Sequence, residues 1–458
     1  MSERLTRPAA EVVVDWLVQL DGARVPPRVA DTVRRLVLDV AGLCIAARRE
    51  PYIDATLAAV DRGGPCTAVG HTGGFDAFGA ALVNGTAAHG EDYDDTFEGG
   101  PVHAGAVVVP AVLAAAEREG LSGERVMVGI AAGVELMCRL SLVAPTGAHR
   151  AGFHPTAVFG ALAAAAAVGV ALRLPAPALV SALGIAGSMA SGIIEYLAEG
   201  TWTKRMHAGW AAQSGIRAAL MARGGFEGPR TVLDGTHGFY KAFAPSIPAN
   251  FQHLLHELGE RWVTQDLAFK PYACGTMTQP FIDCAIALAK DGVRAEDIVD
   301  IECRVGEGTV HRLWEPLASK RRPPTPYAAK FSTPFCVAVA FFDRRAGFAQ
   351  FTVARIQDPR VLALAAKVRY VVDPTDQYPR NFSGHLRATL RDGTPREHRQ
   401  PHMRGGAKEP LTDEEVRVKF LDNVAHGGWS AQAAQRLLRA SESVLDGDRM
   451  PSLQEFRA

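Results

Sequence analysis

Apolar residues recur at helical spacing through the first two thirds of the chain. They repeat every three or four positions in "AAEVVVDWLVQL", and Pro26 and Pro27 stand where a helix begins, ahead of "RVADTVRRLVLDVAGLCIAARR". Strand signals are scarce in this part. The pattern predicts further helices at about 76–89, 103–119, 123–144, 155–173, 177–190 and 207–224. Many of these helices are rich in Ala and Gly, and such small side chains let helix backbones approach closely.

The pattern changes after about residue 268, where apolar and polar residues begin to alternate. In "IVDIECRV", Ile301, Cys303 and Val305 alternate with charged residues, which predicts a half-buried strand. "VRYVV" at 368–372 has strand composition, and "HLRATLRDGT" alternates before an Asp392-Gly393 turn. Helical patterns at about 279–290 and 332–341 lie between these strands, and "KRRPPTPYAAKF" at 320–331 is typical of a loop. This part of the chain is therefore an α+β segment.

Helical patterns return near residue 410. Thr412 and Glu415 form a capping-box signature before "VRVKFLDNVA", and "SAQAAQRLLRASESVL" is the last predicted helix. At 458 residues the chain is long enough for two cores. We therefore predict a mainly α fold: a large all-helical domain formed by both chain ends (1–268 plus 405–458) and an inserted smaller α+β lid domain (269–404).

Composition and charge exclude several classes of partner. The chain is 48% hydrophobic and 21% charged, which is the profile of a well-packed soluble protein. Lysine and arginine number 49 and aspartate and glutamate number 49, so the balance argues against nucleic acid or an anionic membrane as the main partner. An anionic small molecule therefore needs positive groups that are gathered locally.

Cysteine usage and the apolar runs favour a cytoplasmic protein. The seven cysteines are spread widely without a CxxC pair, which argues against a disulfide scaffold, a zinc ribbon and cysteine-rich iron–sulfur motifs. The N-terminal stretch "MSERLTRPAAEVVVDWLVQL" has acidic residues within its apolar part and no signal-peptide core. The runs 157–172 and 174–194 are too short, or too rich in Pro, Ser and Gly, for a bilayer, and we interpret both as buried helices.

The segment "NGTAAHGEDYDDTF" at 84–97 gathers Glu91, Asp92, Asp94 and Asp95 beside His89. If a helix ends near His89, then His89 and Asp92 are three residues apart and share a face. Crowded carboxylates in a dry pocket push their pKa values apart, which suits one acid and one base. Two other readings stay open: a helix end whose Asp side chains cap the next turn, and a metal site, although no EF-hand glycine pattern follows.

Other basic and histidine residues stand near the starts of apolar helices, where exposed N–H groups favour anions. Taken singly, each histidine is more often a cap or a core residue, and each lysine a solvated charge. Together they predict a pocket for a substrate with two or three carboxylates. The residues in question are His103 in "GPVHAGAVVV", His154 in "GFHPTAVFG", Lys204, Arg205 and His207 in "TKRMHAGW", Lys270 in "AFKPYACG" and Lys330 in "AAKFSTPF".

These segments, taken in order over nearly the whole chain, resemble the MmgE/PrpD family. The matching stretches are "NGTAAHGEDYDDT", "VHAGAVVVPAVLAA", "GFHPTAVFGALAAAAAVGVAL", "KRMHAGWAAQSGIRAALMARGGFEGP", "FKPYACGTMTQPFID" and "AAKFSTPFCVAVA". The family includes 2-methylcitrate dehydratases, cis-aconitate decarboxylases and iminodisuccinate epimerases. The resemblance implies a large helical domain with a smaller α+β lid, a homodimer, an active site between the domains, and activity without a metal or an organic cofactor.

The resemblance also implies roles for individual residues. By it, Asp92 and His154 are the candidate acid and base, with Thr96 and His207 orienting them, while His103, Lys204 and Lys270 bind substrate carboxylates. His103 follows the acidic motif after a loop that is one residue longer than in some members. Many dehydratases carry a histidine where this chain has Met277 in "GTMTQ", and its loss weakens the case for 2-methylcitrate itself.

The family's three reactions each need a carbanion or enediolate beside a carboxylate, whose charge the enzyme must hold. We expect a hydro-lyase that acts on a small hydroxy di- or tricarboxylate such as 2-methylcitrate or a relative. An epimerase of a dicarboxylate is the second hypothesis, and a cis-aconitate-type decarboxylase is the third. A non-catalytic binder of an anionic metabolite is a fourth, against which the histidines and Asp92 weigh.

Overall fold

The computed structural model describes residues 6–448 and 450–457, so the first five residues of the predicted helical domain lie outside the described residues. The chain divides into two compact units. Unit 1 comprises residues 1–90, 94–267 and 413–458, and unit 2 comprises residues 91–93 and 268–412. The first boundary lies one residue before the predicted one, and the second lies eight residues after it. Residues 91–93, expected in the helical domain, instead group with unit 2.

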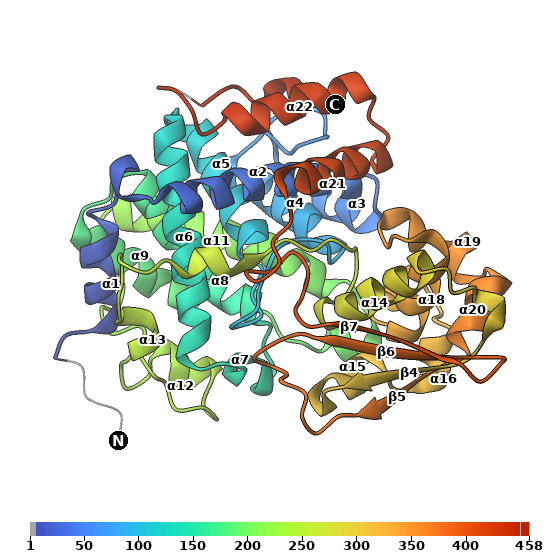
Figure 1. Ribbon diagram of the computed structural model, residues 1–458. Coiled ribbons are helices and arrows are strands. Elements are labelled where there is room, and N and C mark those ends of the chain that lie inside the picture. Colours follow the sequence, from blue (N-terminus) through green and yellow to red (C-terminus); the bar gives the residue numbers. More distant parts are fainter. Residues whose placement is uncertain (1–5, 449, 458) are drawn as a thin grey trace. The chain divides into compact units, whose positions relative to one another are not determined.

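Unit 1 is helical, which confirms the predicted mainly α fold class (Figure 1). Every long helix predicted before residue 268 is present. The helices of unit 1 are α1 (Ala9–Leu17), α2 (Pro27–Ala47), α3 (Pro51–Leu57), α4 (Ala77–Gly90), α5 (Ala104–Glu119), α6 (Gly123–Val143), α7 (Gly147–Arg150), α8 (Pro155–Ala171), α9 (Ala176–Met189), α10 (Tyr196–Glu199), α11 (Thr203–Arg223), α12 (Phe239–Phe243), α13 (Gln252–Leu255), α21 (Asp413–His426) and α22 (Ala431–Ser443).

Small residues let the central helices of unit 1 pack closely. Helix α11 lies against both α4 and α8 (Figure 1). Where α11 meets α4, a Cβ atom added to Gly85 would lie 2.6 Å from the Cα atom of Gly209. One added to Gly209 would lie 2.1 Å from the carbonyl oxygen of Leu82. No side chain fits at such distances, so the glycine pair sets how closely α4 and α11 approach.

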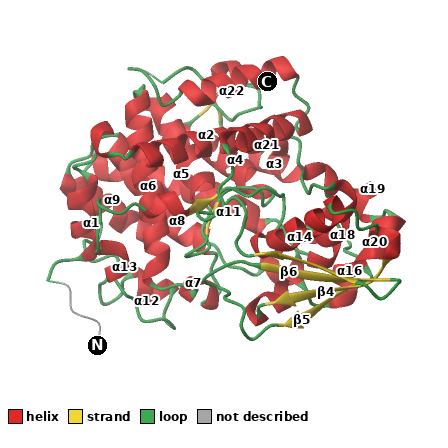
Figure 2. Ribbon diagram, in the orientation of Figure 1, coloured by secondary structure: helices red, strands yellow, loops and turns green. Residues whose placement is uncertain are grey.

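Unit 2 is a four-stranded sheet with helices packed on it (Figure 2). The strand order is β5-β4-β6-β7, with β4 parallel to β5 and antiparallel to β6. Helix α14 packs on β6 and β7 and also contacts α18. The elements are α14 (Gln279–Lys290), β4 (Ile298–Val305), α15 (Val310–Leu313), α16 (Leu317–Arg321), α17 (Pro326–Ala329), α18 (Thr333–Asp343), α19 (Val353–Ile356), α20 (Pro359–Ala365), β5 (Val368–Val372), β6 (Gly384–Leu390) and β7 (Pro395–Gln400).

The alternation predicted for the sheet is confirmed. Ile301, Cys303 and Val305 of β4 are buried, and in the register Cys303 lies opposite Leu386 of β6. Strand β7 was missed because its sequence, "PREHRQ", is polar and largely exposed, so it carries no apolar alternation. The segment 320–331, expected to be a loop, contains the end of α16 and all of α17. The first two thirds of the chain also contains elements that the pattern did not predict: the strands β1 (Arg62–Cys66) and β2 (Thr96–Phe97) and the short helices α3, α7, α10, α12 and α13.

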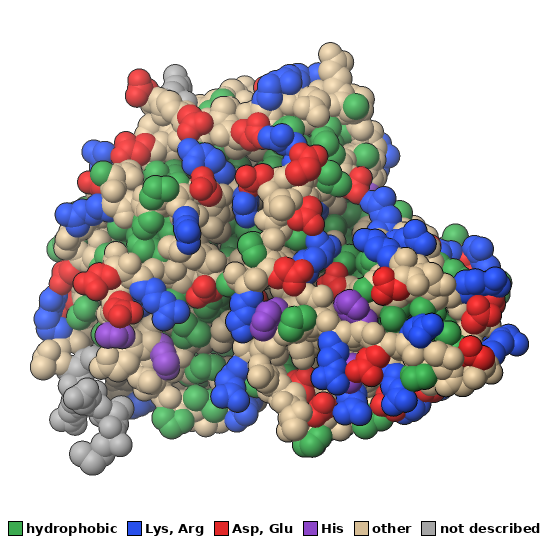
Figure 3. Space-filling view, viewed as in Figure 1, with side chains coloured by type: hydrophobic (Ala, Val, Ile, Leu, Met, Phe, Trp, Pro, Cys, Tyr) green, Lys and Arg blue, Asp and Glu red, His purple; other side chains and the backbone are tan. Residues whose placement is uncertain are grey.

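Helix α6 is long and apolar enough to cross a membrane by length and composition, but 89% of its apolar window is buried inside the protein. That burial is typical of the core helix of a soluble protein. On the face shown in Figure 3, basic and acidic side chains are interspersed, in keeping with the overall charge balance. The seven cysteines are free and buried.

Candidate functional site

Four histidines from four elements of unit 1 form one contiguous cluster. His89 lies in the last turn of α4, His103 and His154 directly precede α5 and α8, and His207 lies in the first turns of α11. Ring centroids are 5.0 Å apart for His89 and His103, 5.4 Å for His89 and His154, and 5.2 Å for His154 and His207. The helix packing described above therefore brings together the three predicted histidines and adds His89.

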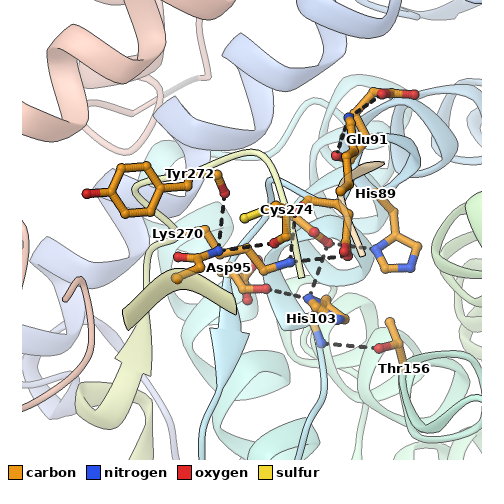
Figure 4. A network of polar contacts seen from close by, with 12 residues as sticks. His89, Glu91, Asp95, His103, Thr156, Lys270, Tyr272 and Cys274 are labelled. Atoms are coloured by element: carbon orange, nitrogen blue, oxygen red, sulfur yellow. Dashed lines mark hydrogen bonds and ion pairs between the residues drawn. The ribbon is translucent and has the colours of Figure 1, made fainter. Parts of the chain in front are cut away.

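Hydrogen bonds to the acidic segment orient two of the imidazoles. The Nδ1 atom of His89 lies 2.7 Å from Oδ2 of Asp94, and both side chains are fully buried. The Nδ1 atom of His103 lies 2.6 Å from the carbonyl oxygen of Asp95, and the His103 amide donates to Thr156 Oγ1 at 3.2 Å (Figure 4). Since a carbonyl oxygen only accepts, Nδ1 of His103 carries a hydrogen.

The Nε2 atom of His89 is buried and finds no hydrogen-bond partner among the described residues. With Asp94 accepting at Nδ1, neutral His89 has its lone pair on Nε2. A buried polar atom without a partner is unusual in a folded protein and is a feature of chemically active sites. The arrangement is therefore an aspartate–histidine pair with a base at its far end.

His154 and His207 meet directly, with their Nδ1 atoms 3.1 Å apart. One Nδ1 donates and the other accepts, so at least one of the two rings is a neutral imidazole. Burial, followed by the nearby His89, His207, Lys204 and His103, lowers the pKa of His154 well below its usual value. Burial, followed by His89 and Lys204, lowers the pKa of His207 to about 3. Both rings are therefore neutral at physiological pH, and each has one ring nitrogen with a lone pair.

Lys204 begins α11 one turn before His207 and is half-buried. Its ammonium is among the charges that lower the pKa values of His154 and His207. It therefore supplies positive potential at the histidine cluster, where a substrate carboxylate would be attracted.

Tyr196, in α10, places its ring edge-on to two of the histidines. Its centroid lies 6.2 Å from that of His154 and 5.8 Å from that of His207. Tyr196 is buried and closes this side of the cluster. Nothing in its sequence context marked it as part of the site.

The cluster also meets the distance requirement for a shared cation. Ligand atoms of His89, Asp94 and His103 all lie within 4.8 Å of one another. However, Nδ1 of each histidine already has an oxygen acceptor at 2.6–2.7 Å, which is a hydrogen-bond distance. The arrangement fits proton transfer better than metal ligation.

Asp92 and Lys270, two further predicted residues, form an ion pair in unit 2. The Lys270 ammonium donates to the Asp92 carbonyl oxygen at 3.0 Å and to Oδ1 at 3.2 Å. The Lys270 side chain is fully buried and that of Asp92 is 5% exposed. The ammonium that was predicted to bind a substrate carboxylate is thus held by a carboxylate of the protein.

Asp92 does not share a helix face with His89, contrary to prediction. Helix α4 ends at Gly90, and Asp92 adopts a left-handed backbone conformation with φ of 59°. Beyond the helix end the 3.6-residue period no longer applies, and the carboxylate that reaches His89 is Asp94. The motif contained both residues of this pair, but spacing alone could not say which carboxylate pairs with the histidine. Thr96, predicted to orient the acid or base, is buried in β2.

A cavity of 640 Å³ lies elsewhere in unit 1. It is lined by α1 and α9 residues and by the 225–230 turn, including Glu11, Pro177 and Phe226. None of the predicted site residues lines it, so it is not the candidate site.

Two family models match the chain. The MmgE/PrpD N-terminal domain matches residues 11–252, and the MmgE/PrpD C-terminal domain matches residues 272–444. The two matches end and begin on either side of the boundary between the two units.

The curated relatives include proteins named cis-aconitate decarboxylase. One from Aspergillus terreus is 26% identical over 96% of this chain and 93% of its own length. One from Mus musculus is 30% identical over 76% of this chain and 71% of its own length. A cis-aconitate decarboxylase-like protein, oryM, from Aspergillus oryzae is 26% identical over 97% of this chain and 95% of its own length.

Proposed function

Since the chain belongs to the MmgE/PrpD family, we propose that it is a lyase that acts on a small polycarboxylic acid by proton transfer beside a carboxylate. The observation that carries the proposal is the contact between His154 and His207, two buried imidazoles with lowered pKa values. A purely structural pair would gain nothing from burying two such rings against each other beside a lysine.

Each predicted residue then has a role. His154 exchanges protons with the substrate carbon, and His207 holds its tautomer through the Nδ1–Nδ1 hydrogen bond. Lys204 binds a substrate carboxylate as a cation, and His103 does so when Nε2 is also protonated, because its Nδ1–H is already donated to the Asp95 carbonyl oxygen. Asp92, held by Lys270, is a further proton-transfer candidate, and Thr96 stays the candidate for orienting an acid or base. Only Tyr93 separates Asp92 from Asp94 in the chain, so both groups belong to one acidic segment.

Decarboxylation of a cis-aconitate-like acid is the first candidate reaction, because relatives with that name match over 93–95% of their own length. In such a reaction the bond between a carbon and its carboxylate breaks, carbon dioxide leaves, and the electron pair stays on the substrate. A second carboxylate next to that carbon delocalises the charge, which Lys204 stabilises. The bound carboxylates of the substrate offset the positive charge near His154, so this ring takes up a proton from solvent and passes it to the carbon, which completes the product.

Dehydration of a hydroxy polycarboxylate is the second candidate. It needs a base to take a proton from carbon and an acid to assist the departing hydroxide. Neutral His154 suits the first task, and the same ring, once it has taken the proton from carbon, can pass that proton to the departing hydroxide. Met277 packs against an apolar cluster of Ala268, Phe382 and Met403, so this position supplies no proton donor.

The test is a panel of citrate, 2-methylcitrate, cis-aconitate and iminodisuccinate, each followed by proton NMR in D₂O with the purified protein. Release of carbon dioxide with one deuteron incorporated identifies a decarboxylase. Formation of an alkene from a hydroxy acid identifies a dehydratase, and exchange without net loss identifies an epimerase. Binding without turnover or exchange of any acid in the panel would overturn the proposal.

We further propose a cytoplasmic homodimer. Seven buried free thiols suit a reducing compartment. The exposed side chains Trp202, Met206 and Trp210 recur at four-residue spacing along the start of α11, a face that a second copy would cover. Light scattering should give twice the mass of the chain, and a monomer at micromolar concentration would contradict this.

A further inference from the structure

The short segment Glu91–Tyr93 leaves α4 after Gly90 and is anchored in unit 2 by all three of its residues. Lys330 binds Glu91, Lys270 binds Asp92, and the Tyr93 hydroxyl donates to the Pro271 carbonyl oxygen at 3.0 Å. The Tyr93 ring also packs edge-on against Phe348, with centroids 5.3 Å apart. Three consecutive anchored residues indicate that the position of this segment is tightly specified.

The two lysines bind the segment in the same way. The Lys330 ammonium donates to the Glu91 carbonyl oxygen at 2.8 Å and to Oε2 at 2.5 Å. The Lys270 ammonium donates to the carbonyl oxygen and the carboxylate of Asp92 at 3.0 and 3.2 Å. In each pair the carbonyl contact fixes the main chain and the carboxylate contact fixes the side chain.

Burial means that both lysine ammonium groups require their acidic partners. The Lys330 and Lys270 side chains are 3% and 0% exposed, and a buried ammonium is tolerated only when it is paired. The Lys330 ammonium also lies 5.1 Å from the ring centroid of Phe348, which narrows its position further. Asp92 holds a left-handed backbone conformation, which is unfavourable for a residue with a Cβ and persists only when its surroundings impose it.

We infer that Lys330 and Glu91 are positioning residues for Asp92: together with Lys270 they set the backbone path that aims the Asp92 carboxylate. The inference rests on the proposed function, in which Asp92 transfers a proton. Neither Lys330 nor Glu91 needs to touch the substrate. Their effect passes through the peptide bond that joins Glu91 to Asp92.

The first test is Lys330→Met in the full-length protein, assayed on whichever acid of the panel is turned over. Loss of the anchor lets Asp92 move, so kcat should fall about 10- to 100-fold, as a misplacement near 1 Å typically causes. KM should stay within about twofold, because no substrate contact is removed. Unchanged kcat, or a rise in KM alone, would overturn the inference.

Four further variants separate positioning from a general loss of structure. Lys330→Arg keeps the charge and should recover most of the kcat lost in Lys330→Met. Glu91→Gln keeps the carbonyl contact and should lose less activity than Lys330→Met, and the double variant should be no worse than Lys330→Met alone. Lys367→Met, which removes a lysine bonded to the Ile298 carbonyl oxygen in the sheet, is the matched control and should keep wild-type kcat.

Asp92→Asn distinguishes failure of the inference from failure of the proposed function. If Asp92→Asn is inactive while Lys330→Met and Glu91→Gln are fully active, Asp92 is required but is not positioned by this pair, and the inference fails alone. If Asp92→Asn is fully active, Asp92 transfers no proton, and both fail. If Lys330→Met does not fold, the kcat values of Lys330→Arg and Glu91→Gln still decide the question. The inference expects kcat near wild type in Lys330→Arg and a lower kcat in Glu91→Gln, and wild-type kcat in Glu91→Gln would contradict it.

Discussion

Two of the buried polar centres of unit 1 differ in how completely their hydrogen bonds are satisfied. One is the histidine cluster of His89, His103, His154 and His207 with Asp94. The other is the pair of Glu135 and Arg139, one turn apart on α6, whose Arg139 Nε donates to Glu135 Oε1 at 2.6 Å. Both centres are almost fully buried, so burial alone does not tell them apart.

Backbone groups saturate the Glu135–Arg139 pair. The Glu135 carboxylate accepts from the amides of Val263 and Thr264, at 3.1 and 2.9 Å, and from the Thr264 hydroxyl. The Arg139 guanidinium donates to four carbonyl oxygens, those of residues 254, 256, 257 and 261. The pair fastens the 254–264 segment to α6, with no lone pair or proton left over for chemistry.

The histidine cluster is less completely satisfied. His89 Nε2 lacks a hydrogen-bond partner among the described residues. The Nδ1 atoms of His154 and His207 hydrogen-bond to each other rather than to the backbone. Since an unsatisfied buried group costs about 1–3 kcal/mol, such an arrangement persists in a fold when it serves a function. The comparison teaches that a buried ion pair with full backbone pairing has no group left for chemistry, whereas buried imidazoles with unpaired nitrogen atoms keep lone pairs that proton transfer needs.

The largest expected effect is on turnover in the histidine cluster. His154→Gln removes the proposed base, so kcat should fall roughly 10²–10⁴-fold while the thermal unfolding midpoint changes little. Steady-state kinetics and calorimetry measure the two quantities, and His253→Ala, at an exposed histidine, is the control. Wild-type kcat in His154→Gln would show that the histidine cluster does not act in catalysis through His154.

The next effect is on stability at the other centre. Arg139→Met leaves the Glu135 carboxylate buried without its cation, so the free energy of unfolding should fall by about 3–5 kcal/mol. The kcat of the folded fraction should be unchanged. Arg223→Met breaks a partly exposed pair with Glu119 and should cost no more than about 1 kcal/mol in urea unfolding. Loss of kcat per folded molecule in Arg139→Met would show that the two centres are not separate.

The third effect is on substrate binding by Lys204, beside the histidine cluster. A charge-assisted hydrogen bond to a carboxylate contributes about 1.5–3 kcal/mol, so Lys204→Met should raise KM roughly 10- to 100-fold. Lys204→Arg should raise it less. A variant with unchanged KM would leave Lys204 as a source of potential at His154 and His207 only.

The smallest effect is on the pH dependence of stability. The pKa of His207 is lowered to about 3 in the folded protein, so below about pH 6.5 the unfolded chain binds a proton that the folded chain does not. Stability should be greatest above pH 6.5 and fall as the pH drops, by up to about 1.4 kcal/mol per pH unit for each such histidine. Urea unfolding between pH 7 and 5.5 should show a shallower slope in His207→Gln. An equal slope would mean that folding does not lower the pKa of His207.

Local pattern alone determined most of the fold. Helical periodicity located α4, α5, α6, α8, α9 and α11, and period-two alternation located β4 and β6, because each of these elements buries one face or all of its surface. The pattern did not predict the edge strand β7 or the short helices of 310–330, because exposed or very short elements leave no periodic apolar signal. Proline, glycine and capping residues marked the ends of several helices, as Ser430 does for α22.

The sequence by itself also indicated the candidate residues for the chemistry: the acidic segment, the three histidines beside helix starts and the lysines. Only the tertiary structure decided how they pair. In the structure His89 pairs with Asp94 rather than with Asp92. His154 contacts His207, which lies 53 residues later in the chain. Lys270 and Lys330 form ion pairs with the consecutive residues Asp92 and Glu91. The reason is that a periodic pattern encodes the faces of one element, whereas pairings between elements follow from how closely the helices approach, as at Gly85 and Gly209, and no local pattern records that distance.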